Sequence, residues 1–155
     1  MSPAARNVLG VEQRISLITL GVDDVARARA FYERGLGWTP TQSAEGVVFY
    51  QLPGVALALF GRDDLAEDAR HRIDGRFSGI TIAINQRTEA DVDAVLAQAQ
   101  AAGATILKPA EKVFWGGYSG YFADLDGHVW EVAVNPHWTI NDDGTLTIIP
   151  AEAPG

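Results

Sequence analysis

Residues 120–131 read Gly-Tyr-Phe-Ala-Asp-Leu-Asp-Gly-His-Val-Trp-Glu, and this stretch decides the fold. Apolar and aromatic residues on either side of its centre predict two strands, at 118–123 and 128–134. The Asp-Leu-Asp-Gly sequence at 124–127 is typical of a tight turn, because Asp bonds nearby backbone groups and Gly accepts a left-handed conformation. The stretch therefore predicts an antiparallel hairpin.

The residues upstream of this hairpin complete a β-α-β-β-β unit. Residues 80–84 are β-branched and apolar, which favours a strand. Thr88 can cap a helix whose apolar side chains recur every three or four residues, and Gly103 ends it. A further strand is expected at 105–107 before the hairpin begins.

The same order of elements occurs earlier in the chain. Residues 15–22 predict a strand, Asp24 can cap the helix that follows, and Gly37 lies at its end. Three further strands are expected, at 38–42, 47–52 and 55–60, and the last two are joined by a Pro-Gly turn.

The two halves align as an internal repeat. Turn residue Gly54 matches Gly127, and in this register Ala58 lies opposite Glu131. Any two α+β hairpin units can be aligned this loosely, but the order of elements and the turn glycines favour a true repeat. The predicted fold class is α+β, built from two βαβββ modules.

These boundaries give a domain organisation for the whole chain. The parts are an N-terminal extension (1–13), the first module (14–60), a linker rich in Arg, Asp and Glu (61–76), the second module (77–136), a C-terminal hairpin (137–149) and a disordered tail (150–155).

Composition restricts the function classes. The chain has 155 residues, 47% of them hydrophobic, no cysteine and a net charge of −8. The missing thiols exclude disulfides and thiolate metal sites, and the negative charge disfavours nucleic acid as a partner. No apolar run approaches the roughly 20 residues that cross a bilayer, and the N-terminus lacks the pattern of a secretory signal. We therefore expect a cytoplasmic protein without a membrane span.

Two separated motifs resemble those of a known family. Residues 20–24 (Leu-Gly-Val-Asp-Asp), 30–33 (Ala-Phe-Tyr-Glu) and 36–38 (Leu-Gly-Trp) resemble the opening signature of the vicinal-oxygen-chelate superfamily, which includes glyoxalases, bleomycin-resistance proteins and extradiol dioxygenases. Residues 120–131 resemble its closing signature. The resemblance implies curled sheets that enclose a cavity for a small ligand, and a homodimer.

The family's metal-using members take ligands from the first and last strands of each half. Carried over, these positions fall on Leu17, Ala58, the neighbourhood of Gly79, and Glu131. Only Glu131 can donate to a metal, and one carboxylate does not hold a divalent ion. We therefore expect no metal and no cofactor.

Glu131 is the candidate catalytic residue, as a general base or as an acceptor for a ligand. The alternative is that it bonds a neighbouring Tyr or Trp, or faces solvent. If strands alternate strictly, His128 and Trp130 share the face opposite Glu131. His71 and His137 lie in linker and tail, where a solvated role is expected.

Aromatic side chains near Glu131 and the apolar ligand positions of the first half form the expected binding surface. These candidates are Phe114, Trp115, Tyr118, Tyr121, Leu17 and Ala58. Core packing is the alternative for the aromatic residues, and the sequence leaves it open.

The sequence favours metal-independent binding, including sequestration, of a small apolar or aromatic molecule. An alternative is a lyase, isomerase or dioxygenase-type enzyme that uses Glu131 as base or within an unrecognised metal site. A third is a structural or regulatory protein, which would expose an apolar patch instead of a cavity. Whether cavities form within one chain or across a dimer stays open.

Overall fold

The computed structural model describes residues 13–148 except 14, 16, 76 and 79. Most of the expected N-terminal extension, the whole expected tail and the ligand position near Gly79 therefore lie outside the described residues. Within the described part, no helix is long and apolar enough to cross a membrane.

The first module has one helical segment and four strands. Its elements are β1 (Leu17–Val22), α1 (Val25–Arg29), the π-helical turn η1 (Ala30–Gly35), β2 (Gln42–Ala44), β3 (Val47–Leu52) and β4 (Val55–Gly61). Asp24 accepts a hydrogen bond from the Arg27 backbone, so it caps α1 as its position in the sequence predicts.

The second module repeats this order. Its elements are β5 (Ile82–Asn85), α3 (Glu89–Ala101), β6 (Thr105–Lys112), β7 (Tyr118–Ala123) and β8 (Val129–Val134). Thr88 caps α3 by accepting from the Asp91 backbone. A small hairpin of β9 (Trp138–Ile140) and β10 (Leu146–Ile148) follows.

The two sheets have the same topology, with strand orders β1-β4-β3-β2 and β5-β8-β7-β6. In each sheet the first strand runs parallel to the last strand of its module, and the other pairs are antiparallel. Gly54 and Gly127 have φ of 79° and 84°, so the matched turns share the left-handed conformation that Gly adopts readily. The predicted α+β fold of two βαβββ modules is confirmed.

Three parts of the chain depart most from the expected elements. The strand expected at 38–42 begins later, because the Trp38 backbone still donates to the Tyr32 carbonyl. β6 runs on to Lys112, and its register shifts between Ile106 and Glu111, next to Pro109, which has no N–H for the ladder. The linker contains a helix, α2 (Arg62–Ala69), which buries no residue and so has no apolar stripe to reveal it.

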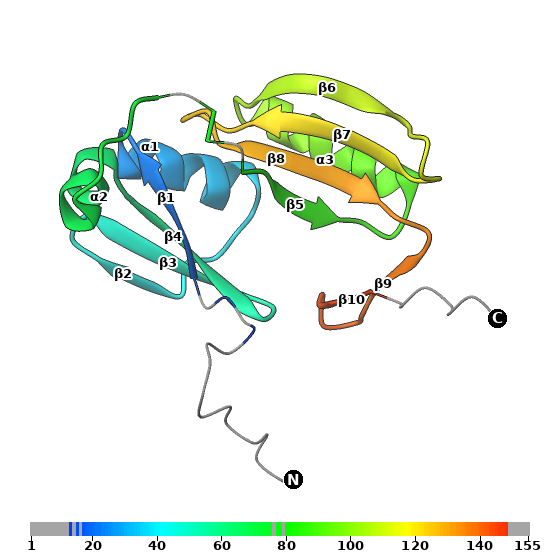
Figure 1. Ribbon diagram of the computed structural model, residues 1–155, viewed down its shortest axis with the longest axis horizontal. Coiled ribbons are helices and arrows are strands. Elements are labelled where there is room, and N and C mark those ends of the chain that lie inside the picture. Colours follow the sequence, from blue (N-terminus) through cyan, green and yellow to red (C-terminus); the bar gives the residue numbers. More distant parts are fainter. Residues whose placement is uncertain (1–12, 14, 16, 76, 79, 149–155) are drawn as a thin grey trace, which may run out of the picture.

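Both modules contribute to one hydrophobic core. Phe31 and Tyr32 of η1 lie against Phe122 and Trp130 of the second sheet, and the last two rings stack at 6.1 Å between centroids. Trp130 is buried, which confirms the predicted alternation along β8. Figure 1 shows the two sheets side by side, with the β9–β10 hairpin beyond the end of β8.

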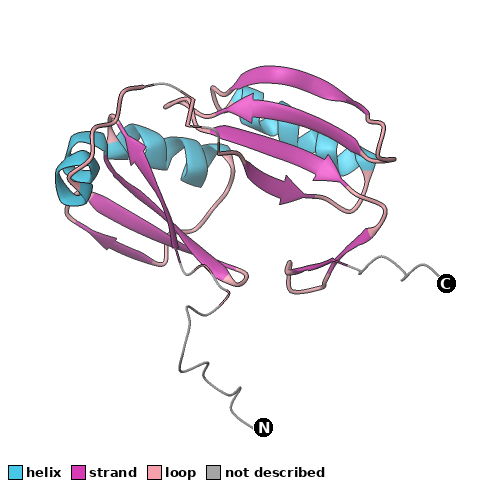
Figure 2. Ribbon diagram, in the orientation of Figure 1, coloured by secondary structure: helices cyan, strands magenta, loops and turns pink. Residues whose placement is uncertain are grey.

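The two four-stranded sheets are curled but not closed. Figure 2 shows α3 behind the strands of the second sheet. A hollow of about 440 Å³ lies beside α2, lined by Phe60, Asp64, Glu67, Asp68 and Arg70. Its mostly charged lining does not suit an apolar ligand.

Candidate functional site

One rung of the second sheet carries the candidate residue Glu131. In the register of the strands, Glu131 on β8 pairs with Tyr121 on β7 and with Ala83 on β5. The neighbours Phe122 and Trp130 belong to the core. Because side chains alternate along a strand, Tyr121 and Glu131 lie on the outer face, away from α3.

Tyr121 and Glu131 are joined directly. The Tyr121 hydroxyl donates to Oε2 of Glu131, and both side chains are half-buried. This hydrogen bond, with a smaller contribution from burial, raises the pKa of Tyr121 to about 12. The phenol therefore keeps its proton throughout the physiological range, and it acts as donor to the carboxylate.

The surroundings of this pair combine one cation with small side chains. Lys108 on β6 pairs with Tyr121 on β7. Its Nζ lies 3.1 Å from Glu111 Oε1, so it forms an ion pair with Glu111. On the next rung Ser119 pairs with Ala133, and both are buried. The outer face next to Glu131 therefore carries small side chains, and other parts of the chain cover those of Ser119 and Ala133.

The first module has an apolar counterpart of this rung. Ala58 on β4 pairs with Phe49 on β3 and with Thr19 on β1. Ala58 is 1% exposed, whereas Leu17, one rung away on the same face, is 42% exposed. Phe49 thus holds the place of Tyr121. Sequence reasoning missed it, although the Pro-Gly turn sets the register that places it opposite Ala58.

The other three aromatic candidates lie elsewhere. Tyr118 is on the opposite face of β7 from Tyr121, and its hydroxyl donates to Asp93 Oδ1 of α3 at 2.7 Å. Phe114 is fully exposed in the β6–β7 turn. The Trp115 ring lies so close to Gly117 that a Cβ there would overlap it. Of the four aromatic candidates, Tyr121 is the one that contacts Glu131.

The Asp-Leu-Asp-Gly turn holds the modules together. Asp124 Oδ1 accepts from the backbones of Asp126 and His128, each at 2.9 Å, and Oδ2 accepts from the Tyr32 hydroxyl at 2.6 Å. His128 Nε2 lies 2.7 Å from the Gly21 carbonyl. The sequence indicated a turn or surface role for His128, and the structure places it between the modules.

Comparison with known proteins agrees with this architecture. The model of the Glyoxalase/Bleomycin resistance protein/Dioxygenase superfamily matches residues 14–132. The chain belongs to this superfamily. Its fold is similar to that of a glyoxalase-related enzyme from Fulvimarina pelagi, with 38% identity over 89% of this chain and 99% of that chain and a TM-score of 0.84.

Two solved structures of lower sequence identity share the fold. A hypothetical protein from S. aureus has 22% identity, covers 81% of this chain and 96% of that chain, and has a TM-score of 0.71. A lactoylglutathione lyase from Agrobacterium tumefaciens has 23% identity, 79% and 94% coverage, and a TM-score of 0.62. At these identities the likeness concerns architecture alone.

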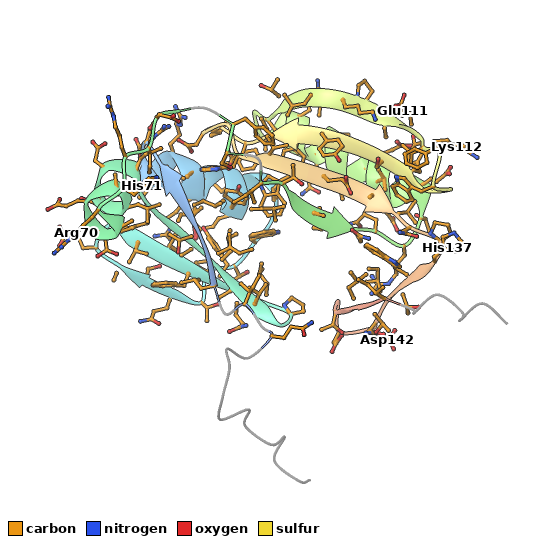
Figure 3. All side chains as sticks on the ribbon, in the orientation of Figure 1. Arg70, His71, Glu111, Lys112, His137 and Asp142 are labelled. Carbon is orange, nitrogen blue, oxygen red and sulfur yellow. The ribbon has the colours of Figure 1, made fainter. Side chains whose placement is uncertain are left out.

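The residues of this superfamily member do not fit a divalent metal at the usual place. Ala58 and Glu131 occupy matching rungs, and the strands beside them offer Thr19 and Ala83. Among the described residues, no three His, Asp or Glu side chains come close enough together to hold an ion. Figure 3 shows His71 and His137 at opposite ends of the molecule.

Proposed function

We propose that this protein binds a small apolar or aromatic molecule on the outer face of its second sheet, without a metal. The observation that carries the proposal is the Tyr121–Glu131 pair, which lies half-buried beside small side chains. An aromatic ring supplies flat apolar area, and a carboxylate supplies an acceptor that orients the ligand.

The first sheet supplies a second apolar surface in this proposal. The register of the strands places Leu17, Phe49 and Ala58 on one face of this sheet. Sequestration of such a ligand requires no chemical step.

Titration with N-phenyl-1-naphthylamine, a neutral apolar fluorophore, tests the proposal. We expect saturable binding in the presence of EDTA, and Tyr121→Ala should weaken it about tenfold because the ring that lies against the ligand is lost. Tyr118→Ala is the matched control, since Tyr118 lies on the opposite face of the same strand. Absence of saturable binding, or binding that EDTA abolishes, would contradict the proposal.

An enzymatic role is the second candidate. The Tyr121–Glu131 pair and the description of the Fulvimarina pelagi relative as an enzyme favour it. Glu131 would then serve as a general base in a lyase or isomerase reaction. A turnover assay for lactoylglutathione, with and without added Ni²⁺ or Zn²⁺, separates the candidates: turnover that Glu131→Gln abolishes supports the enzyme.

The proposal includes a homodimer in the cytoplasm. β1 and β5 are edge strands of their sheets, and Leu17 on β1 is exposed, as is Ile80 just before β5. A second copy could cover these edges and complete the open binding surface. Light scattering coupled to size-exclusion chromatography measures the mass that decides between one copy and two.

A further inference from the structure

The hydrogen bonds of Glu131 restrict which polar groups a ligand can present to this carboxylate. Tyr121 donates to Oε2, and within the described part of the chain it is the one side chain that donates to this carboxylate. A carboxylate has about four lone-pair sites, so acceptor capacity remains on Glu131. The Tyr121 proton, in contrast, is already in use.

The cation on the same rung is also engaged. Lys108 Nζ lies 3.1 Å from Glu111 Oε1, which leaves Glu131 without a positive partner on its rung. β5 contributes Ile82–Asn85, which carries no charge. Together with the net charge of −8, this makes the face negative at Glu131.

We infer that Glu131 makes this face selective for aromatic ligands that carry an N–H or O–H donor and no negative charge. The inference rests on the proposed function and names the ligand class of the same site. A neutral or cationic donor fills the open acceptor positions of the carboxylate. An anion, or a group that only accepts hydrogen bonds, would face the carboxylate without a donor. The neighbouring phenol and ammonium groups cannot serve, because they are already bonded.

Two fluorophores that differ at one group test this selectivity. These are 5-(dimethylamino)naphthalene-1-sulfonamide, which presents N–H donors, and the corresponding sulfonate, which is an anion on the same ring system. We expect the wild-type protein to bind the sulfonamide at least about tenfold more tightly, because like charges at a partly desolvated site are unfavourable.

Glu131→Gln isolates the cause of the preference. Its amide removes the charge and can donate to the sulfonate, so the ratio of the two dissociation constants should fall to within about threefold. Glu67→Gln is the matched control, because it removes the same charge from an exposed position on α2 and should preserve the ratio. Thermal unfolding of both variants verifies that they are folded.

The outcomes separate this inference from the proposed function. The selectivity is overturned by any of three results: equal affinity for the two fluorophores, failure of the sulfonamide to bind, or a ratio of dissociation constants that Glu131→Gln leaves unchanged. In each case, binding of N-phenyl-1-naphthylamine would still support a ligand site. If none of the three fluorophores binds, both proposals are wrong.

Discussion

At the scale of single residues, Tyr32 connects more of the structure than any candidate ligand residue. Its hydroxyl donates to Asp124 at 2.6 Å and accepts from Trp130 Nε1 at 3.2 Å. Its side chain is 1% exposed. Burial, and then the neighbouring charge of Asp124, raises the pKa of Tyr32 well above the usual value of the phenol.

Replacement of Tyr32 by Phe should lower the free energy of unfolding by roughly 1–3 kcal/mol, because it leaves a buried carboxylate and an indole N–H short of a partner. Urea unfolding at pH 8 measures this loss. A result within error of the wild type would show that the hydrogen bonds contribute nothing net.

The same variant carries a pH signature. A phenol whose pKa is higher in the folded state stabilises the protein fully below its unfolded pKa of about 10, and this contribution is lost as pH rises through the folded value. Above about pH 10 the wild-type protein should therefore lose stability more steeply than Tyr32→Phe. Parallel slopes would contradict the assignment.

At the scale of elements, η1 decides how the modules meet. The sequence predicts a helix here, but its hydrogen bonds run from Leu36 to the Phe31 carbonyl, one residue further than in an α-helix. Gly35, at the end of this turn, lies so close to α3 that an added Cβ would be 2.5 Å from the Cβ of Ala102. The close approach therefore requires glycine at one of the two positions.

Gly35→Ala should accordingly destabilise the protein by about 1–3 kcal/mol through overpacking. Ala102→Gly in the same chain should recover part of this loss, because it removes the atom that clashes. A double-mutant cycle measured by chemical denaturation gives the coupling energy. Strictly additive effects would mean that the two positions do not touch.

At the scale of the whole molecule, the two modules share one core and one buried turn. The core cluster draws residues from both sheets, and Asp124 joins the modules through Tyr32. Neither half therefore keeps its buried surface if the other unfolds. This predicts a single cooperative transition for a chain that consists of a structural repeat.

Unfolding followed by tryptophan fluorescence and by far-ultraviolet circular dichroism should give one midpoint. Asp124→Ala should lower both midpoints together, with a loss of roughly 3 kcal/mol, because it removes three hydrogen bonds to a buried carboxylate. Two separate transitions in either protein would show that the modules unfold independently.

The sequence by itself determined the fold class, the repeat and the faces of β8. Periodicity and turn glycines are local properties, so the turns at Gly54 and Gly127 and the alternation of Trp130 with Glu131 could be read directly. The lack of metal-ligating side chains at the expected positions could be read in the same way, because the residue types are known without coordinates.

Only the tertiary structure decided which aromatic side chain contacts Glu131. Tyr118 and Tyr121 lie three residues apart, and the pleat sends one to α3 and the other to Glu131. Strand pairing places Phe49 opposite Ala58, and the contact between the modules places His128 beside the Gly21 carbonyl. These positions depend on how separate elements pack. The neighbours of a side chain across a sheet or between modules are set by the burial of the whole core, and not by its own stretch of sequence.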